Sequence, residues 1–133
     1  MTGTLQMPIS PECEDTARQI VDAGLKVNRA LGPGLLESAY EHCLAHELTR
    51  RGLTLSRQTA LPITYEDEIV EAGYRIDMLV SKHVIVEIKA VDKILPLHEA
   101  QLLTYLKLSS IRLGLLLNFN VALFKQGIRR IAF

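Results

Sequence analysis

The sequence predicts a single α/β domain in which helices flank a central mixed sheet. The chain has 133 residues, which is the size of one ordinary domain. Apolar side chains recur at helical spacing over 16–51, whereas residues 58–90 alternate with the period of two that strands show. A strand, a helix and another strand follow one another over 84–118. That succession favours a crossover and therefore a parallel pair of strands within the sheet.

Two helices are predicted in the first part of the chain. Asp15 or Thr16 can cap the first helix, which must end before Gly32-Pro33-Gly34 because proline and glycine cannot continue it. We expect residues 1–15 to form a flexible segment and residues 16–133 to form the folded domain. The two helices are expected to span 16–31 and 35–51, with Gly52 capping the second helix and with Leu36, Tyr40, Cys43 and Leu44 on its buried side.

The remaining elements follow from the change of period and from turn residues. The acidic turn Glu66-Asp67-Glu68 separates two strands, and Ser81-Lys82-His83 separates the second of them from the most strand-like run in the chain. Strands this close in sequence favour an antiparallel meander. The predicted order is α-α-β-β-β-α-β-β, with strands over 58–65, 72–80 and 84–90, a helix over 97–108, and strands over 112–118 and 128–133.

The composition excludes several classes of protein. Lys and Arg total 15, Asp and Glu also total 15, and 48% of the residues are hydrophobic, which argues against a disordered chain or a non-specific nucleic-acid binder. The apolar run 115–117 is far shorter than the ~18 residues of a membrane span. Residues 1–15 lack the features of a signal peptide, and Cys13 and Cys43 form no CxxC pair. We therefore expect a cytoplasmic protein with no membrane contact and no organic cofactor.

A cluster of charged residues is predicted on two adjacent strands. The strand over 84–90 carries apolar residues on both faces, and Glu87 and Lys89 interrupt one of these faces. An ion buried there is costly unless it has a partner. On the preceding strand, Asp77 alternates with apolar side chains. If the two strands form a hairpin about Lys82, Asp77 and Glu87 are equally far from the turn. They are then cross-strand neighbours with Cβ atoms ~5 Å apart.

Two opposed carboxylates favour a divalent cation between them. Like charges at that separation repel each other, and oxygen ligands with retained waters suit Mg²⁺ or Mn²⁺. Lys89 would then point at whatever the cation holds, and hydrolysis of a phosphodiester is the reaction that suits such a set. The alternative interpretation is a surface salt bridge worth less than ~1 kcal/mol.

Two helices contribute further polar residues. Glu37 and Tyr40 lie one turn apart at the start of the second helix, where Glu37 can instead answer the helix dipole and Tyr40 can instead be a core residue. Gln101 and Tyr105 lie four residues apart on the third helix, with His98 one turn earlier. This stripe is either solvated or reaches into the site.

These residues together resemble the motifs of a known family. From about Thr16 to the C-terminus, the chain resembles the GxxExxY protein family within the PD-(D/E)xK nuclease superfamily. The naming motif is present as Gly34, Glu37 and Tyr40, the superfamily signature as Asp77 followed by Glu87-Ile88-Lys89, and the QxxxY element of nucleases related to the RecB type as Gln101 and Tyr105.

The resemblance implies a restriction-endonuclease-like core and a Mg²⁺-dependent nuclease site in which Mn²⁺ can substitute. Asp77 and Glu87 would be the metal ligands, with the backbone carbonyl of Ile88 as a third. Glu37 would bind the metal through water or orient the site. Lys89 would activate or position water. Gln101 and Tyr105 would position the phosphate or brace Lys89.

Several functions fit this set of residues. The first is a nuclease acting on DNA, in repair or in defence against foreign DNA, although the basic residues are dispersed and no aromatic stacking platform is evident in the sequence. The second is a catalytically inactive nuclease-fold module that binds a protein partner or nucleic acid. A hydrolase of small phosphate esters is the third. The apolar strand that ends at Phe133 could also be the edge of a homodimer.

Overall fold

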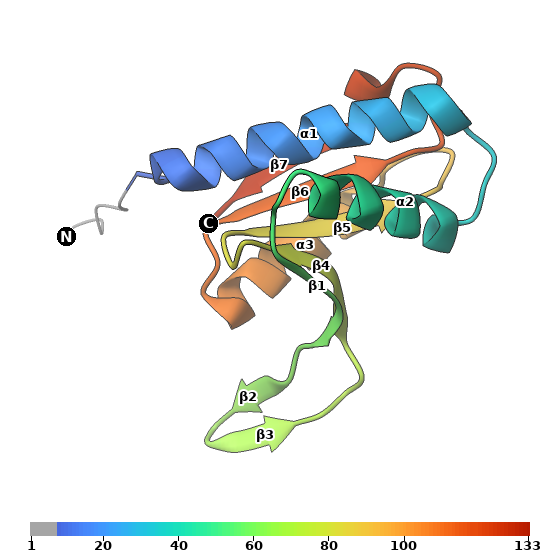
Figure 1. The fold of residues 1–133 in the computed structure, drawn as a ribbon. Coiled ribbons are helices and arrows are strands. Elements are labelled where there is room, and N and C mark those ends of the chain that lie inside the picture. The colour runs from blue at the N-terminus through green and yellow to red at the C-terminus, as the bar shows by residue number, and fades with distance from the viewer. Residues whose placement is uncertain (1–7) are drawn as a thin grey trace.

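Five strands form the central sheet of the computed structural model, which describes residues 8–133 (Figure 1). The strand order is β1-β4-β5-β6-β7, and β2 and β3 form a separate two-stranded sheet. Along the chain the elements are α1 (Pro11–Leu31), α2 (Glu37–Arg50), β1 (Leu55–Ala60), β2 (Ile63–Tyr65), β3 (Glu68–Val70), β4 (Arg75–Val80), β5 (Val84–Lys89), α3 (Pro96–Ser109), β6 (Leu113–Asn118), the 3-10 helix η1 (Phe124–Gly127) and β7 (Ile128–Ala132).

The helices cover both faces of the sheet. α1 and α2 pack on one face, where Val84, Val86 and Ile88 of β5 belong to the larger hydrophobic cluster. α3 packs on the other face, where Ile85 of β5 and Leu116 of β6 belong to a second cluster. The fold class predicted from the sequence, a mixed sheet flanked by helices, is thus confirmed. Among the described residues, no helix is both long enough and apolar enough to cross a membrane.

The pairing of β4, β5 and β6 also agrees with the prediction. β4 and β5 are antiparallel, whereas β5 and β6 are parallel and are joined through α3. Three residues, 81–83, connect β4 to β5, because Val80 pairs with Val84 and the register is centred on Lys82. Ser81 and Lys82, with φ angles of 52° and 60°, are the central residues of a tight turn in which the His83 N–H donates to the Val80 carbonyl at 2.9 Å. Left-handed residues at both central positions match the twist of a hairpin and fix its register.

The start of α1 differs from the prediction. Ser10, rather than Asp15 or Thr16, caps the helix, since its hydroxyl accepts the Cys13 N–H at 3.1 Å. Pro11 follows in the first turn, where its missing N–H costs nothing. Of the segment 1–15 that we expected to be flexible, residues 11–15 are therefore helical, and residues 1–7 lie outside the described part of the chain.

The second helix begins later than predicted. It starts at Glu37, and Leu36, which was expected in the core, is 76% exposed. Cys43 is half-buried rather than buried. Tyr40 and Leu44 lie in the core as predicted.

A projecting hairpin, β2–β3, was not predicted. The expected strand over 58–65 is interrupted at Leu61-Pro62, where the proline has no N–H to donate to a ladder. Glu66 and Asp67 have φ angles of 48° and 68°, so they form a two-residue turn and the chain returns as β3. This hairpin, which we call the β2–β3 arm, extends away from the sheet and helices (Figure 1).

Candidate active site

Asp77 and Glu87 lie opposite each other where β4 and β5 separate. The last ladder pair is Met78↔Val86, and beyond it each carboxylate bonds to the backbone of the other strand. The Asp77 N–H donates to Glu87 Oε2 at 2.8 Å, and the Ile88 N–H donates to Asp77 Oδ2 at 2.8 Å. Side chains thus replace the backbone bonds that would continue the sheet. The register inferred from the turn places the two acids correctly.

The protein holds these two acids in an environment that disfavours their charge. Glu87 is 6% exposed, and Asp77 is half-buried. Burial, together with the nearby Asp77 carboxylate, raises the pKa of Glu87 to about 8, even though the Asp77 N–H and Lys89 favour its ionised form. Burial also raises the pKa of Asp77, against the opposing effect of the Ile88 N–H. Near neutral pH, the pair therefore retains a proton that a cation could replace.

Lys89 lies two residues beyond Glu87 on β5 and is partly exposed. Its positive charge lowers the pKa of both acids, so its ammonium group is close to the pair. Among residues 8–133, no carboxylate lies within ion-pair distance of this lysine. Its amine is therefore available for another partner.

The chain just after Lys89 is held by Asn118 at the end of β6. The side-chain amide of Asn118 donates to the Val91 carbonyl at 2.8 Å, and its oxygen accepts the Val91 N–H at 3.1 Å. The Phe119 N–H also donates to the Lys89 carbonyl at 3.0 Å. These bonds fix the backbone from which Lys89 extends, a role that the sequence analysis did not assign to Asn118.

Glu41 and Gln58 join the site from α2 and β1, and neither was predicted from the sequence. Glu41 is 7% exposed, and its carboxylate accepts from Arg57 at 2.9 Å and from the Gln58 amide at 2.7 Å. The same Gln58 amide lies 3.4 Å from Asp77 Oδ1, and the charge of Glu41 raises the pKa of both Asp77 and Glu87. A link of hydrogen bonds therefore connects Glu41 to the acid pair through Gln58.

The backbone of Gln58 explains how its side chain reaches both acids. Its φ is +50°, which is unusual for a residue other than glycine, and it interrupts the pairing of β1 with β4. The flanking pairs Arg57↔Met78 and Thr59↔Ile76 are kept. A single irregular residue opposite Asp77 thus redirects one side chain toward the site, as bulges near functional sites often do. The sequence offers one weak signal, because Glu41 lies one helical turn after Glu37.

Glu37 is exposed at the first position of α2. Its carboxylate forms no hydrogen bond or ion pair with another described residue. Tyr40 is fully buried and its hydroxyl donates to the Gly32 carbonyl at 2.6 Å and accepts the Leu35 N–H at 3.1 Å. The core interpretation of Tyr40 is therefore the one that the structure shows. This tyrosine positions the loop before α2, and α2 in turn carries Glu41.

Gln101 and Tyr105 approach the acids from α3. The Gln101 amide donates to the Tyr105 hydroxyl at 3.1 Å, and Tyr105 is 6% exposed. Burial raises the pKa of Tyr105 most, and the nearby Glu87 raises it further. His98 has a local role, because its Nδ1 accepts the Leu95 N–H at 3.0 Å at the start of α3. Of the polar residues predicted along this helix, Tyr105 is therefore the one that lies near the acid pair, and Gln101 bonds to it.

The oxygen donors suit a hard divalent cation. Among residues 8–133, no three His, Cys, Asp or Glu side chains converge as a metal-binding group. Asp77 and Glu87, with the backbone carbonyl of Ile88, would supply oxygen ligands of the kind that Mg²⁺ accepts while it keeps several waters. The raised pKa of both acids is the electrostatic cost that such an ion would relieve.

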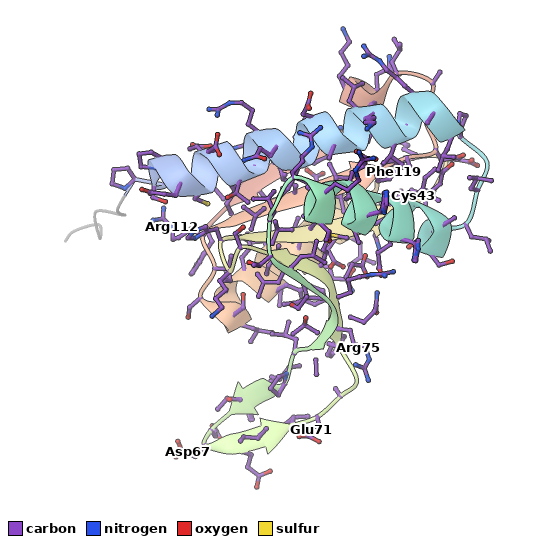
Figure 2. The ribbon with its side chains drawn as sticks, viewed as in Figure 1. Cys43, Asp67, Glu71, Arg75, Arg112 and Phe119 are labelled. Atoms are coloured by element: carbon purple, nitrogen blue, oxygen red, sulfur yellow. The ribbon has the colours of Figure 1, made fainter. Side chains whose placement is uncertain are left out.

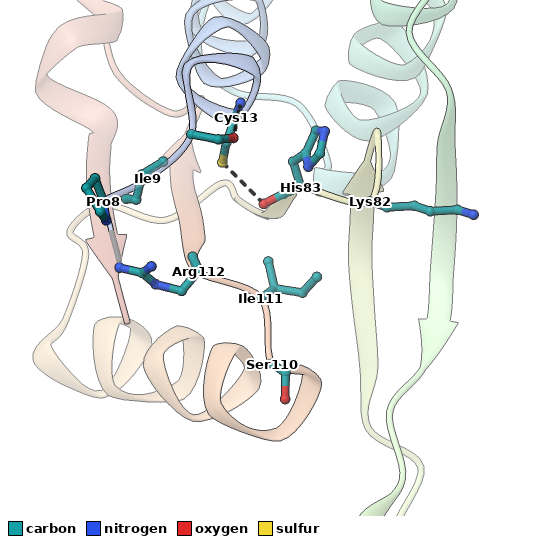
Figure 3. A pocket seen from close by; sticks show the side chains of 9 residues that line it. Pro8, Ile9, Cys13, Lys82, His83, Ser110, Ile111 and Arg112 are labelled. Atoms are coloured by element: carbon teal, nitrogen blue, oxygen red, sulfur yellow. Dashed lines mark hydrogen bonds between the residues drawn. The ribbon is translucent and has the colours of Figure 1, made fainter. Parts of the chain in front are cut away.

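A hollow lies at the end of β5 that is far from Glu87 and Lys89. Cys13, Lys82, His83 and Arg112 line it, and the Cys13 thiol donates to the His83 carbonyl at 3.6 Å (Figure 3). Its lining contains no carboxylate and none of the predicted site residues. The predicted site residues therefore lie outside this hollow.

The chain forms a mixed sheet with helices on both faces, and two acids and a lysine lie where two strands of this sheet separate. This arrangement is that of a restriction-endonuclease-like α/β fold. A family model described as the PD-(D/E)XK nuclease superfamily matches residues 14–131. The chain belongs to this superfamily. No curated protein and no solved structure matches the chain.

Proposed function

We propose that the protein is a Mg²⁺-dependent nuclease that hydrolyses phosphodiester bonds of DNA, in repair or in defence against foreign DNA. The observation that carries the proposal is the pair of Glu87, which is buried, and Asp77, which is half-buried, beside the ammonium of Lys89, which forms no ion pair with a carboxylate of residues 8–133. Membership of the nuclease superfamily supports the same reaction class. A fold alone does not establish activity, so the proposal rests on the arrangement of these side chains.

In the proposed site, Asp77 and Glu87 hold the metal ion together with the Ile88 carbonyl. The chemistry supplied by a bound divalent cation is polarisation of a phosphoryl oxygen and a lower pKa for a coordinated water. Lys89 donates hydrogen bonds to the attacking water or to the phosphoryl oxygen as negative charge develops there.

Neighbouring residues keep these groups in place. Glu41 and Gln58 orient Asp77, and Gln101 orients the hydroxyl of Tyr105. Glu37, which the resemblance assigns to the metal through water, is exposed on the first turn of α2. We assign it no step, because Glu41 is the acid of α2 that connects to Asp77.

The test is cleavage of DNA by the wild type and by Lys89→Ala in Mg²⁺ or Mn²⁺. We expect Lys89→Ala to lower the rate by about 10²- to 10³-fold, as the loss of one donor to a developing charge does elsewhere. Lys93→Ala is the matched control, because Lys93 is an exposed lysine in the loop that follows β5. If Lys89→Ala cleaves DNA at the wild-type rate, the activity comes from another site or from a contaminant.

An inactive module that binds nucleic acid or a protein is the second candidate. The observation in its favour is that both site carboxylates already accept backbone N–H groups. DNA binding without cleavage in either metal would support this candidate. Homodimerisation through β7, an edge strand of the sheet, stays a separate prediction, and a monomer in sedimentation velocity at micromolar concentration would contradict it.

A further inference from the structure

A groove of about 350 Å³ lies beside the candidate active site, between α3 and the base of the β2–β3 arm. We call it the Tyr74 groove. This volume is at the lower end of the range for small-molecule sites and is enough for a planar ring system. Its lining includes the apolar side chains Ile63, Leu97 and Leu108, the two rings of Tyr74 and Tyr105, and the polar group of Thr104.

Tyr105 and Gln101, which belong to the candidate active site, also line the groove. The pKa of Tyr105 responds to the charges of both Glu87 and Asp77. Gln101 donates to the Tyr105 hydroxyl at 3.1 Å. The groove and the candidate active site therefore share these two side chains of α3.

The chemistry of the groove matches that of a nucleobase. The ring of Tyr74 lies edge-on to Tyr105, with centroids 6.3 Å apart and planes 63° apart, and Tyr74 is 43% exposed. An exposed aromatic face offers stacking area to a flat, apolar ring. At the rim, the Gln101 carbonyl oxygen, the Thr104 hydroxyl and the imidazole of His98 can bond to the polar edge of that ring.

The charges around the groove disfavour a duplex that is held by its phosphates. The segment 58–74 carries four acidic residues and no Lys or Arg, and Figure 2 shows Asp67 and Glu71 along the arm. Elsewhere, Arg51 is paired with Asp22 at 2.7 Å and Arg130 with Glu14 at 2.7 Å. Because the segment beside the groove is acidic, contacts to bases must supply more of the affinity there than contacts to phosphates do. A base is free to stack on protein only when it is unpaired.

We propose that the Tyr74 groove binds an unpaired nucleobase next to the phosphodiester held at Asp77 and Glu87, so that the substrate is single-stranded DNA or a single-stranded end. The inference rests on the proposed nuclease function, because that function places a phosphodiester at the acid pair. It adds a residue outside the predicted motifs, Tyr74, and a substrate class. The sequence showed no stacking platform because residues 74 and 105 meet only through the fold.

The test is equilibrium binding measured by fluorescence anisotropy, with EDTA present so that no cleavage occurs. The probes are a labelled oligothymidylate of about ten nucleotides, an abasic strand of the same length and charge, and a blunt duplex. We expect the wild type to bind the oligothymidylate about tenfold or more tightly than either other probe, as stacking of a base on an aromatic ring predicts. Its affinity should also fall only weakly with salt, because few phosphates are contacted.

The variants separate stacking from a general loss of structure. Tyr74→Ala should lose the preference for the oligothymidylate over the abasic strand, whereas Tyr74→Phe should keep it. Tyr65→Ala is the matched control, because Tyr65 is an exposed tyrosine of the β2–β3 arm that does not line the groove. Equal binding of the three probes by the wild type, or an equal loss in Tyr65→Ala and Tyr74→Ala, would overturn the proposal.

A cleavage assay in Mn²⁺ distinguishes this inference from the proposed function. Duplex cleaved as fast as single strand would leave the nuclease in place and overturn the inference. A preference for the oligothymidylate that depends on Tyr74, without cleavage of any probe, would support the groove and contradict the proposed reaction.

Discussion

Glu87 is a carboxyl group that folding buries beside another carboxyl group, and this arrangement has a cost that depends on pH. In the folded protein the pKa of Glu87 is raised to about 8, whereas the ordinary pKa of a glutamate is 4.5. The stability linked to this group is therefore complete below pH 4.5 and is lost as the pH rises through 8.

We expect Glu87→Gln to remove this pH dependence. Gln has a similar shape and no titrating proton, so its oxygen can still accept the Asp77 N–H. In EDTA, the melting temperature of the wild type relative to Glu87→Gln should decrease as the pH is raised from 5 to 9. Thermal unfolding followed by circular dichroism measures this difference. A difference that stays constant over that range would show that the pKa of Glu87 is not raised.

The residue scale also shows which parts of the site a sequence can predict. Asp77 and Glu87 were found because a short turn at Lys82 fixes their register, and strand pairing is a local consequence of such a turn. Gln58 could not be found, because its position depends on one residue with a positive φ in the middle of a strand. For Glu41 the sequence offers only its place one helical turn after Glu37, since its contacts with Arg57 and Gln58 join α2 to β1 through the fold.

At the scale of the elements, one tyrosine determines how α2 begins. The Tyr40 hydroxyl bonds to both the Gly32 carbonyl and the Leu35 N–H, and its ring stacks on Phe119 with centroids 4.9 Å apart. Gly34 within the same loop has a φ of +106°, which favours glycine. The motif Gly34, Glu37 and Tyr40 therefore includes two residues that shape the loop and start of α2.

We expect Tyr40→Phe to lower the free energy of unfolding by about 1–2 kcal/mol, because two partly buried backbone groups lose their partner. Urea denaturation measures the change. Tyr65→Phe is the control, since Tyr65 is 67% exposed and makes no hydrogen bond through its side chain with a described residue. Equal stability of Tyr40→Phe and the wild type would show that water replaces the hydroxyl without loss.

The β2–β3 arm was not predicted because its turn and its strands are very short. Glu66 and Asp67 were expected in a turn, and they do form one, but their positive φ angles make it a tight hairpin turn. The strand on either side is only three residues long, too short for its alternation of apolar and polar residues to show clearly. The longer helices and the strands of the core were predicted within a few residues.

At the scale of the whole molecule, a bound metal ion should stabilise the folded state. A ligand that binds only the folded protein adds about 2.7 kcal/mol when its concentration is a hundred times its dissociation constant. We expect Mg²⁺ or Mn²⁺ to raise the melting temperature of the wild type by several degrees, and to leave Asp77→Asn and Glu87→Gln unchanged.

The control for metal binding is Asp92→Asn, which removes an exposed carboxylate from the loop that follows β5. Its melting temperature should rise with metal as that of the wild type does. Because metal must displace a proton from the acid pair, the rise should be larger at pH 8 than at pH 6. Equal shifts in all four proteins would show that the ions act elsewhere.

The whole fold was predicted in outline because its core follows simple periodicities. The parallel β5–β6 pair follows from a strand–helix–strand succession, and the break between the first two helices follows from Gly32-Pro33-Gly34. The Tyr74 groove, by contrast, is formed by the arm, the start of β4 and α3 together. Surfaces of that kind depend on packing between distant segments, which no local pattern contains.

Asp77 both donates a hydrogen bond to the strand that bears Glu87 and accepts one from it. The Glu87 carboxylate accepts the N–H of Asp77, and the Asp77 carboxylate accepts the N–H of Ile88, so the two strands stay joined through side chains beyond their last ladder pair. Truncation of either acid to alanine would therefore remove a bond between the strands as well as a charge, whereas Asp77→Asn and Glu87→Gln keep an oxygen that can accept the same N–H.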